Sequence, residues 1–298
     1  MSSRWVLITG ADGFLGGKII RRLLNTTDYH VMGLTISMDL PEKMLERENL
    51  TYSDRLRFMT NQEFFDQKTD LPTIEACIHL AFSRKVQPAA DIASSIQFAA
   101  AVFHKLKELN VQKVINMSSQ GVYGNTTEYR TEETIPAPEN NYTMAKFATE
   151  MLFNDILKEC RQHTCLRLDL VAQSQNVVRG LCKSAKEGAI ALRGGKQCFS
   201  FIDAEDAASA VVSMLQADGD WDPCYNVGWN HNRYTLVELA EIIAAAAERC
   251  GYKKPSISLD EQDIHLCAGM ISTRFMEKTG WKPEFPIEKT VEIMMKEG

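Results

Sequence analysis

The chain alternates short apolar runs with longer segments in which apolar residues recur every three or four positions. The short runs contain few polar residues, which is typical of strands buried on both faces of a sheet. In the first two thirds of the chain they are RWVLIT (4–9), HVMGLT (30–35), RLRFM (55–59), EACIHLA (75–81) and KVINMS (113–118). Helical spacing lies between them, as in 13–25 and 90–110. This β-α-β-α order predicts an α/β fold, a doubly wound parallel sheet with helices on both faces.

The pattern continues through the rest of the chain with shorter elements. We predict helices at 143–161, 176–192, 206–216, 236–251 and 287–298, and strands at 165–171, 199–203 and 224–228. The main sheet domain is expected to span 1–170. Residues 171–298 are expected to form mainly a smaller C-terminal α/β lobe that binds the substrate, with 199–216 returning to the main sheet.

Composition narrows the possible partners. The chain has 298 residues, of which 45% are hydrophobic, enough to bury a full core and too many for a disordered chain. Its 33 Lys and Arg against 39 Asp and Glu give a net charge of -6, and no polybasic cluster is present. We therefore expect a small-molecule substrate, and neither a nucleic acid nor an anionic membrane as a partner.

The cysteines and the N-terminus indicate a compartment. The eight cysteines include no C-x-x-C pair and no Cys/His cluster with zinc-ligand spacing, so we expect free thiols and no metal site. The N-terminus MSSRWVLITG leads directly into the first predicted strand, which leaves no room for a signal peptide. No apolar run approaches the ~18 residues of a membrane span. These features predict a cytoplasmic protein.

A glycine-rich turn, ITGADGFLGG (8–17), joins the first predicted strand to the first helix. Its Gly10, Gly13 and Gly16 are placed where the pyrophosphate of a dinucleotide meets a helix N-terminus. Glycine there permits a sharp turn, close approach of backbone N–H groups to phosphate oxygens, and tight packing of helix on strand. We therefore expect a Rossmann-type sheet that binds NAD or NADP, with Phe14 and Leu15 of the same turn among its contacts.

A second motif carries residues suited to proton transfer. The segment NNYTMAKFATE (140–150) places Tyr142 and Lys146 four residues apart, so a helix directs both side chains from one face. A tyrosine has a pKa near ~10 and needs a nearby cation to exchange protons at neutral pH. Lys146 is positioned in the sequence to supply that charge.

Together these motifs resemble the extended branch of the short-chain dehydrogenase/reductase superfamily, the NAD-dependent epimerase/dehydratase family. TGADGFLG matches its glycine motif, NMSSQGVYG (116–124) its serine segment, and Y-x-x-x-K its catalytic pair. The resemblance implies that Tyr142 is the acid/base and that Lys146 also binds the nicotinamide ribose. It further implies that Ser119 holds the substrate oxygen, with Ser118 as a packing or cofactor-contacting neighbour.

The resemblance extends over nearly the whole chain. HLAFS (79–83) resembles the loop after the fourth strand, which implies that Leu80, Ala81 and Phe82 line the adenosine and ribose of the cofactor. We interpret His79 as a core histidine rather than a ligand. Members of the superfamily commonly dimerise through two long helices, here 90–110 and 143–161, so a homodimer is expected.

Departures from the family pattern bear on the reaction. Dehydratases and decarboxylases of this branch carry an acidic residue just before the valine that is Val122 here, and this chain has Gln120 and Gly121 in those places. Epimerisation, or simple oxidation or reduction, is therefore favoured over elimination of water. A glutamate from elsewhere, such as Glu132 or Glu133, remains an alternative acid.

Cofactor choice is left open by the sequence. Thr35 stands at the end of the second predicted strand, where NAD-preferring members carry an aspartate for the ribose diol. Thr35 and Ser37 could instead bond a 2′-phosphate, with Arg84 or Lys85 nearby. NAD and NADP both stay possible on these residues.

The predicted lobe also departs from the pattern of nucleotide-sugar enzymes. Phe199 occupies the place of an arginine that often pairs with the substrate diphosphate, although Arg179 or Arg193 could substitute. We predict an NAD(P)-dependent epimerase or oxidoreductase that acts on a sugar or nucleotide sugar by hydride transfer. The alternatives are a reductase of a non-sugar ketone or aldehyde, which Phe199 favours, and a non-catalytic dinucleotide-sensing module.

Overall fold

The structure is a computed structural model that describes residues 4–83 and 88–296. Its internal contacts divide the chain into two compact units. Unit 1 comprises Met1–Ser118, Pro138–Arg167 and Ala208–Tyr225, and unit 2 comprises Ser119–Ala137, Leu168–Ala207 and Asn226–Gly298. Arg84 and Lys85, the basic residues considered for a 2′-phosphate, lie outside the described residues.

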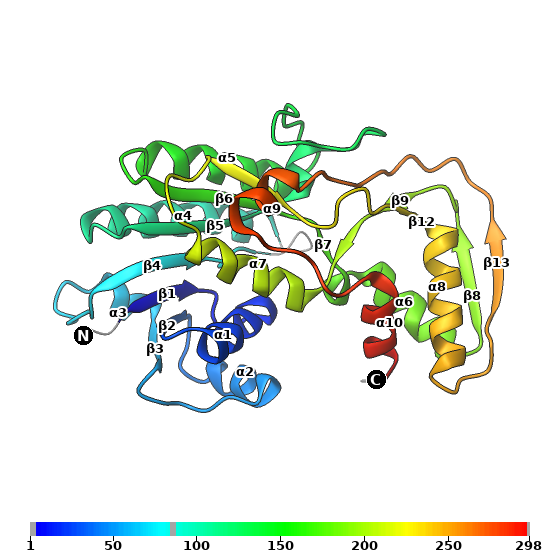
Figure 1. Cartoon of the computed structure of the whole chain (residues 1–298), viewed down its shortest axis with the longest axis horizontal. Helices are drawn as coiled ribbons and strands as arrows, with labels where there is room; N and C mark the ends of the chain where they lie inside the picture. Colours follow the sequence, from blue (N-terminus) through cyan, green and yellow to red (C-terminus); the bar gives the residue numbers. More distant parts are fainter. Residues whose placement is uncertain (1–3, 84–87, 297–298) are drawn as a thin grey trace. The chain divides into compact units, whose positions relative to one another are not determined.

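Unit 1 is built on a seven-stranded sheet of order β11-β6-β5-β4-β1-β2-β3 (Figure 1). Its strands are β1 Trp5–Thr9, β2 His30–Thr35, β3 Leu56–Thr60, β4 Ile74–His79, β5 Lys113–Ser119, β6 Gln162–Leu168 and β11 Cys224–Val227. β1 pairs in parallel with β2 and β4, β2 with β3, and β4 with β5. The order reverses beside β1, and such a switch point is where open parallel sheets bind dinucleotides.

Helices follow the strands of this sheet in sequence. They are α1 Phe14–Thr26, α2 Leu40–Glu48, α3 Asn61–Phe65, α4 Ala89–Glu108 and α5 Asn141–Ile156. α4 and α5 pack side by side (Figure 1). Val102 and Phe103 of α4 and Phe153 of α5 share one apolar core with Trp5 and Leu7 of β1. These two helices therefore cover one face of the sheet.

Unit 2 contains three two-stranded sheets, β10 with β7, β12 with β9 and β13 with β8. The strands are β7 Leu170–Val171, β8 Ala189–Arg193, β9 Cys198–Phe199, β10 Phe201–Ile202, β12 Tyr234–Thr235 and β13 Ser256–Asp260. The helices are η1 Gln120–Tyr123, η2 Ala172–Ser174, α6 Asn176–Lys186, α8 Leu236–Arg249, α9 Thr273–Thr279 and α10 Ile287–Lys296, and the chain passes into unit 1 within α7 Ala204–Gln216. α6, α8 and α10 pack together beside the β8–β13 pair and bury a second core (Figure 1).

The predicted fold class is confirmed: the protein is α/β, with a Rossmann-type sheet and small C-terminal sheets. The predicted helix 176–192 is wrong beyond Lys186, because Gly188 has a φ of +92° and the chain then continues as β8. Residues 199–203 contribute β9 and β10 to small sheets, while β11 takes the outermost position of the seven-stranded sheet. The domain limits at 170 and 171 stay a prediction.

Three further features concern the cysteines, metal ligands and membrane spans. All eight cysteines are free thiols, as expected. Within residues 4–83 and 88–296, no group of three His, Cys, Asp or Glu side chains is arranged to hold a metal ion. No helix in this part of the chain has both the length and the hydropathy needed to cross a membrane.

Candidate active site

The glycine turn of unit 1 has a geometry that only glycine accommodates. Gly10 has a φ of +66°, and a Cβ there would lie 3.0 Å from the backbone nitrogen of Ala81. A Cβ on Gly16 would lie 2.5 Å from the Gly10 carbonyl oxygen and 2.8 Å from that of Ala11. Gly13 caps α1 without any side-chain hydrogen bond. The turn therefore fits a pyrophosphate against the N-terminus of α1.

Two cations border this turn, Arg47 and Lys18, and neither was predicted from the sequence. Arg47 of α2 donates a hydrogen bond from Nη2 to the Gly13 carbonyl oxygen at 2.9 Å. The Arg47 guanidinium lies 5.9 Å from the centre of the Phe14 ring, and the Lys18 ammonium lies 5.7 Å from it. Positive charge at a helix N-terminus adds to its attraction for phosphate. Arg47 could not be found from the sequence, because α2 is short, mostly polar and remote from the turn.

The end of β4 is fixed to β1 by one threonine hydroxyl. Thr9 Oγ1 accepts hydrogen bonds from the backbone nitrogens of Leu80 and Ala81, both at 3.1 Å, and lies 2.8 Å from His79 Nδ1. Because the hydroxyl already accepts two hydrogen bonds, it donates its proton to Nδ1, and His79 carries its own proton on Nε2. Burial lowers the His79 pKa to about 3, so the ring is neutral. The structure thus supports His79 as a core residue that positions the Leu80–Phe82 loop.

Tyr142, Lys146 and Phe82 come together in unit 1. α5 begins at a capping box formed by Asn140 and Thr143, which places Tyr142 in its first turn. Lys146 Nζ lies 4.0 Å from the centre of the Phe82 ring, and the Tyr142 ring meets Phe82 edge-on at 5.9 Å. Lys146 is 5% exposed. The predicted acid/base, the predicted lysine and one predicted cofactor contact therefore form one cluster.

Burial dominates the proton affinities of this cluster. It lowers the pKa of Lys146 to about 7, against the opposing effect of the Glu150 carboxylate. It also raises the pKa of Tyr142 to about 12. The sequence led us to expect the opposite shift for Tyr142, through the charge of Lys146. In the protein alone the cost of burying a phenolate is the larger effect.

A buried ion pair lies one turn beyond Lys146. Arg167 Nη2 donates to Glu150 Oε2 at 2.7 Å, and the Ser118 hydroxyl donates to the same carboxylate. Lys146 Nζ donates to the Met117 carbonyl oxygen at 2.7 Å, next in the chain to Ser118. The hydrogen bond of Ser118 to Glu150 is consistent with its interpretation as a packing neighbour. Glu150 was not predicted, although its spacing of four residues from Lys146 carries the signal.

Ser119 begins unit 2 and caps η1. Its Oγ accepts a hydrogen bond from the Gly121 backbone nitrogen at 3.1 Å, which orients the hydroxyl and leaves its proton for donation. The next side chain, Gln120, is buried and accepts from Arg130 Nη1 at 2.9 Å. The place where dehydratases carry an acid therefore holds a neutral amide anchored to a buried arginine.

The two alternative glutamates are engaged elsewhere in unit 2. Glu132 Oε1 accepts from the Asn226 backbone nitrogen at 2.8 Å, and burial raises the pKa of this carboxyl. Glu133 forms an ion pair with Arg274. Each carboxylate thus has a structural partner, which weakens the case that one serves as an acid for elimination.

Residues at the end of β2 bond to one another. The Thr35 hydroxyl donates to the Ser37 carbonyl oxygen at 2.9 Å, and the Ser37 hydroxyl donates to the Asp39 carboxylate. That bond lowers the pKa of Asp39, so the residue is charged at neutral pH. A negative charge here opposes a 2′-phosphate. Asp39 was not predicted, because it lies beyond the strand end where a ribose-binding aspartate was sought.

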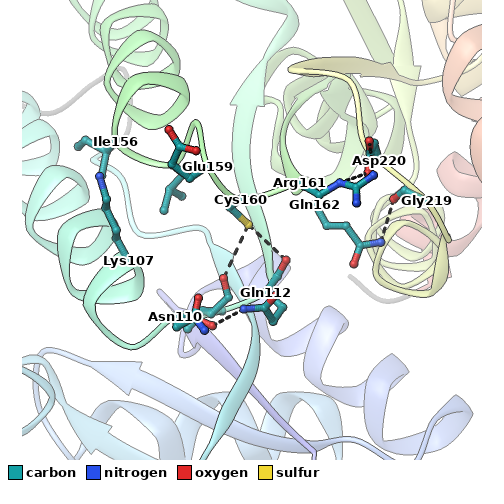
Figure 2. A pocket seen from close by; sticks show the side chains of 12 residues that line it. Lys107, Asn110, Gln112, Ile156, Glu159, Cys160, Arg161, Gln162, Gly219 and Asp220 are labelled. Atoms are coloured by element: carbon teal, nitrogen blue, oxygen red, sulfur yellow. Dashed lines mark hydrogen bonds and ion pairs between the residues drawn. The ribbon is translucent and has the colours of Figure 1, made fainter.

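A cavity of about 470 Å³ lies in unit 1, away from these residues. Figure 2 shows Cys160 among the residues that line it. The Cys160 thiol lies 3.2 Å from the Gln112 carbonyl oxygen and 3.7 Å from that of Val111. The lining segments 110–112 and 159–162 lie at the amino ends of β5 and β6. The glycine turn and His79 follow the carboxyl ends of β1 and β4, so this cavity is not part of the candidate site.

Comparison with known proteins decides the family. The sequence model of the NAD dependent epimerase/dehydratase family matches residues 6–228. The chain belongs to this family. It is therefore an enzyme of the extended short-chain dehydrogenase/reductase type, which confirms the resemblance stated from the motifs.

Individual relatives share the whole chain at low identity. UDP-glucose 4-epimerase of Mycolicibacterium smegmatis is 26% identical over 320 residues, covering 96% of this chain and 97% of that protein. The structure of Bacillus cereus UDP-glucuronic acid 4-epimerase with UDP-glucuronic acid and NAD has a TM-score of 0.81, with 17% identity and 98% of both chains covered. That of Bacillus anthracis dTDP-glucose 4,6-dehydratase with NAD has the same TM-score, with 18% identity, 99% of this chain and 96% of that chain covered. Epimerases and dehydratases share the fold, so the reaction must be argued from residues.

The remaining departure of this family member lies in unit 2. Phe199 stacks on Phe201 with ring centres 6.0 Å apart, so an aromatic pair occupies the place of the expected arginine. Arg179 donates to the Asn176 side chain, and Arg193 lies 3.9 Å from Asp260. Both arginines are exposed and already engaged, which weakens them as substitutes for the missing cation.

Proposed function

We propose that the protein is an NAD-dependent epimerase of a nucleotide-linked sugar, with Tyr142 as acid/base. The observation that carries this proposal is the cluster of Tyr142, Lys146 and Phe82, in which a buried lysine and a phenol share one face of α5. Family membership supplies the reaction class. The residues around the cluster then narrow it.

Each residue has a defined part in the proposed reaction. Bound NAD supplies the hydride acceptor. Tyr142 Oη takes the proton from the substrate hydroxyl as that carbon is oxidised, and returns it when the carbon is reduced on the other face. Ser119 donates its hydroxyl proton to the same substrate oxygen, a bond that strengthens as negative charge develops. Lys146 holds the ribose and provides positive charge near Tyr142, which opposes the effect of burial on the phenol.

The two residues after Ser119, Gln120 and Gly121, favour epimerisation over dehydration. Elimination of water needs an acid beside the carbon that loses its hydroxyl. Gln120 cannot supply one, because its side chain is an amide that accepts from Arg130, and Gly121 has no side chain. The oxidation and reduction of epimerisation require only the hydroxyl proton that Tyr142 handles.

NAD is favoured over NADP by the end of β2. The turn at Gly10, Gly13 and Gly16 fits the pyrophosphate common to both cofactors. The Asp39 carboxylate, bonded to Ser37, places negative charge where a 2′-phosphate would need a cation. A carboxylate is also the group that accepts hydrogen bonds from a ribose diol.

A second candidate function rests on Phe199. An aromatic pair, where related enzymes bind diphosphate, favours a smaller or less charged carbonyl compound, reduced with consumption of NADH. The two candidates differ in their redox balance. An epimerase returns the hydride and leaves NADH absorbance unchanged, whereas a reductase consumes one NADH for each turnover.

The test is direct. The purified chain with NAD is incubated separately with UDP-glucose and with UDP-glucuronic acid, and the sugar products are identified by NMR. We expect the 4-epimer without net NADH. Tyr142→Phe should lower kcat by about 10²-fold or more while NAD still binds. The exposed Tyr52→Phe serves as the matched control and should be unaffected.

Three outcomes overturn the proposal. Undiminished turnover by Tyr142→Phe removes the acid/base assignment. Net NADH consumption with a ketone or aldehyde supports the reductase. NAD binding without turnover of any sugar or carbonyl compound supports a dinucleotide sensor.

We also infer that the protein forms a homodimer through α4 and α5. Met144, Met151 and Leu152 of α5 are 52%, 60% and 37% exposed, so one helix presents three large apolar side chains. Such a patch is typical of a protein–protein contact. Light scattering should give twice the chain mass, and Met151→Glu should shift the mass toward the monomer. A parent protein that is monomeric at high concentration would contradict this inference.

A further inference from the structure

Two cysteines that are far apart in the sequence lie side by side in unit 2. Cys198 of β9 forms a parallel bridge with Cys267. The Cys198 nitrogen donates to the Leu266 carbonyl oxygen at 2.8 Å, and the Ala268 nitrogen donates to the Cys198 carbonyl oxygen at 3.0 Å. Residues paired in this way point their side chains to the same face. The Cys198 thiol donates to the Lys196 carbonyl oxygen at 3.4 Å, two residues earlier in the chain.

Both backbones are held in place on their outer sides. Cys198 pairs with Thr235 of β12. The Cys267 nitrogen donates to Asn125 Oδ1 at 2.6 Å, and its carbonyl oxygen accepts from Arg130 Nη2 at 2.6 Å. Neighbouring strands lie about 4.8 Å apart, which is within the Cα separation of about 4.4–6.8 Å that a disulfide bridges. The usual spacing of neighbouring strands is therefore within the range that a disulfide spans.

Both cysteines of the pair are partly accessible to solvent. Cys198 and Cys267 are half-buried, whereas Cys77 and Cys165 are fully buried. Burial and the second thiol raise the pKa of Cys198, while Arg233 opposes the shift. Because both thiols are half-buried, a small oxidant can reach them more easily than a bulky reagent can.

We propose that Cys198 and Cys267 are an oxidation site, a dithiol that hydrogen peroxide converts reversibly to a disulfide. One thiolate attacks a peroxide oxygen, the O–O bond breaks, and the released hydroxide takes a proton to leave as water. The resulting sulfenic acid is attacked by the second thiol; the S–S bond forms, the S–O bond breaks, and a second water leaves. Two thiols and one peroxide give one disulfide and two waters.

The bond would join β9 to the segment 266–268. That segment also carries the Arg130 and Arg233 contacts at Cys267 and Ala268, and β9 includes Phe199. Oxidation therefore ties together the strand and the loop around the aromatic pair. Because the closed loop is long, the disulfide also restricts the unfolded chain, and the melting temperature should rise.

The experiment uses the full chain, reduced, desalted and exposed to increasing hydrogen peroxide. Free thiols are then alkylated, and peptides are mapped by mass spectrometry. We expect a cross-linked peptide that joins Cys198 to Cys267, with a loss of two hydrogens, before Cys160 or Cys250 is modified. Dithiothreitol should reverse it, and the oxidised protein should melt at a higher temperature than the reduced one.

Matched variants make the result decisive. Cys198→Ser and Cys267→Ser should each abolish the cross-link, whereas Cys160→Ser, which removes another half-buried thiol, should leave it unchanged. The proposal is overturned if Cys160 or Cys250 oxidises while Cys198 and Cys267 still alkylate. It is equally overturned if either residue accumulates as sulfenic or sulfonic acid without cross-linking to the other.

Discussion

Lys146 in unit 1 and Arg130 in unit 2 are both cations with almost no exposed surface, 5% and 1% respectively, yet their surroundings differ. Lys146 donates to one carbonyl oxygen and lies over the Phe82 ring. Arg130 donates to Gln120 Oε1 and to two backbone carbonyl oxygens, those of Gly124 and Cys267. One buried charge is sparsely bonded, and the other is held by three acceptors.

These surroundings suit the two charges to different roles. Burial brings the pKa of Lys146 to about 7, so this side chain can change its charge near neutral pH. Burial also lowers the pKa of Arg130, but an arginine remains protonated in proteins. Lys146 is therefore suited to adjusting a reaction, and Arg130 to fixing the loop that follows Ser119. Changing the first should affect activity, and changing the second should affect stability.

The largest expected effect is on activity at Lys146. Lys146→Met removes the positive charge beside Tyr142 and should lower kcat by about 10³-fold, within the range for loss of acid/base assistance. Its melting temperature should stay equal or rise, because the variant no longer buries a charge. The exposed Lys158→Met is the control, with parental kcat. A marked fall in the melting temperature of Lys146→Met would contradict the inference that Lys146 serves activity rather than stability.

The next effect is on stability at Arg130. Arg130→Met leaves three acceptors without this donor, one of them buried and two half-buried. A buried acceptor without a donor costs about 1–3 kcal/mol and a half-buried one less, and the removal of a buried charge offsets part of this loss. We expect the free energy of unfolding to fall by about 3 kcal/mol in denaturant titrations. Arg161→Met removes an exposed arginine paired with Asp220 and should cost less than about 1 kcal/mol. An equal loss of unfolding free energy in the two variants would contradict the inference that Arg130 fixes the loop after Ser119.

A third effect is the pH dependence of stability at Lys146. Its folded pKa of about 7 lies below the unfolded value of about 10.4, so between these values the unfolded chain binds more protons. The stability cost of Lys146 is therefore full below pH 7 and is relieved as pH rises toward about 10. The stability advantage of Lys146→Met over the parent should shrink across this window by at least about 1.4 kcal/mol. If the stability advantage of Lys146→Met grows with pH, the pKa of Lys146 is not lowered in the folded protein.

These contrasts also mark what the sequence could predict. The glycine turn, the Tyr142–Lys146 pair and the strands of unit 1 were predictable, because each depends on residues that are close together in the chain. The fold class followed from the same local patterns. The helix predicted over 176–192 failed at Gly188, where a left-handed backbone ends an otherwise helical pattern.

Long-range partners were beyond the sequence. Arg47 reaches the Gly13 carbonyl oxygen, and Cys198 meets Cys267, only because separate segments are brought together by the fold. The direction of the Tyr142 pKa was also missed, because burial depends on packing from several elements. Glu150 was not predicted either, although it follows Lys146 by four residues on the same helix; its partner Arg167 is identified only by the structure.

The smallest expected effect is on stability at Gln120, which accepts a hydrogen bond from Arg130 and follows Ser119 in the candidate site. Gln120→Met removes one of the three acceptors of Arg130 and leaves its Nη1 group without that bond, which should cost about 1 kcal/mol. Because Arg130 still holds the Gly124 and Cys267 carbonyl oxygens, the loop after Ser119 should stay in place and kcat should change little. Denaturant titration and the epimerase assay measure the two quantities on one sample. If Gln120→Met lowers the free energy of unfolding as much as Arg130→Met does, the Gln120 amide is the principal acceptor. Arg130 then fixes the loop through one hydrogen bond rather than three.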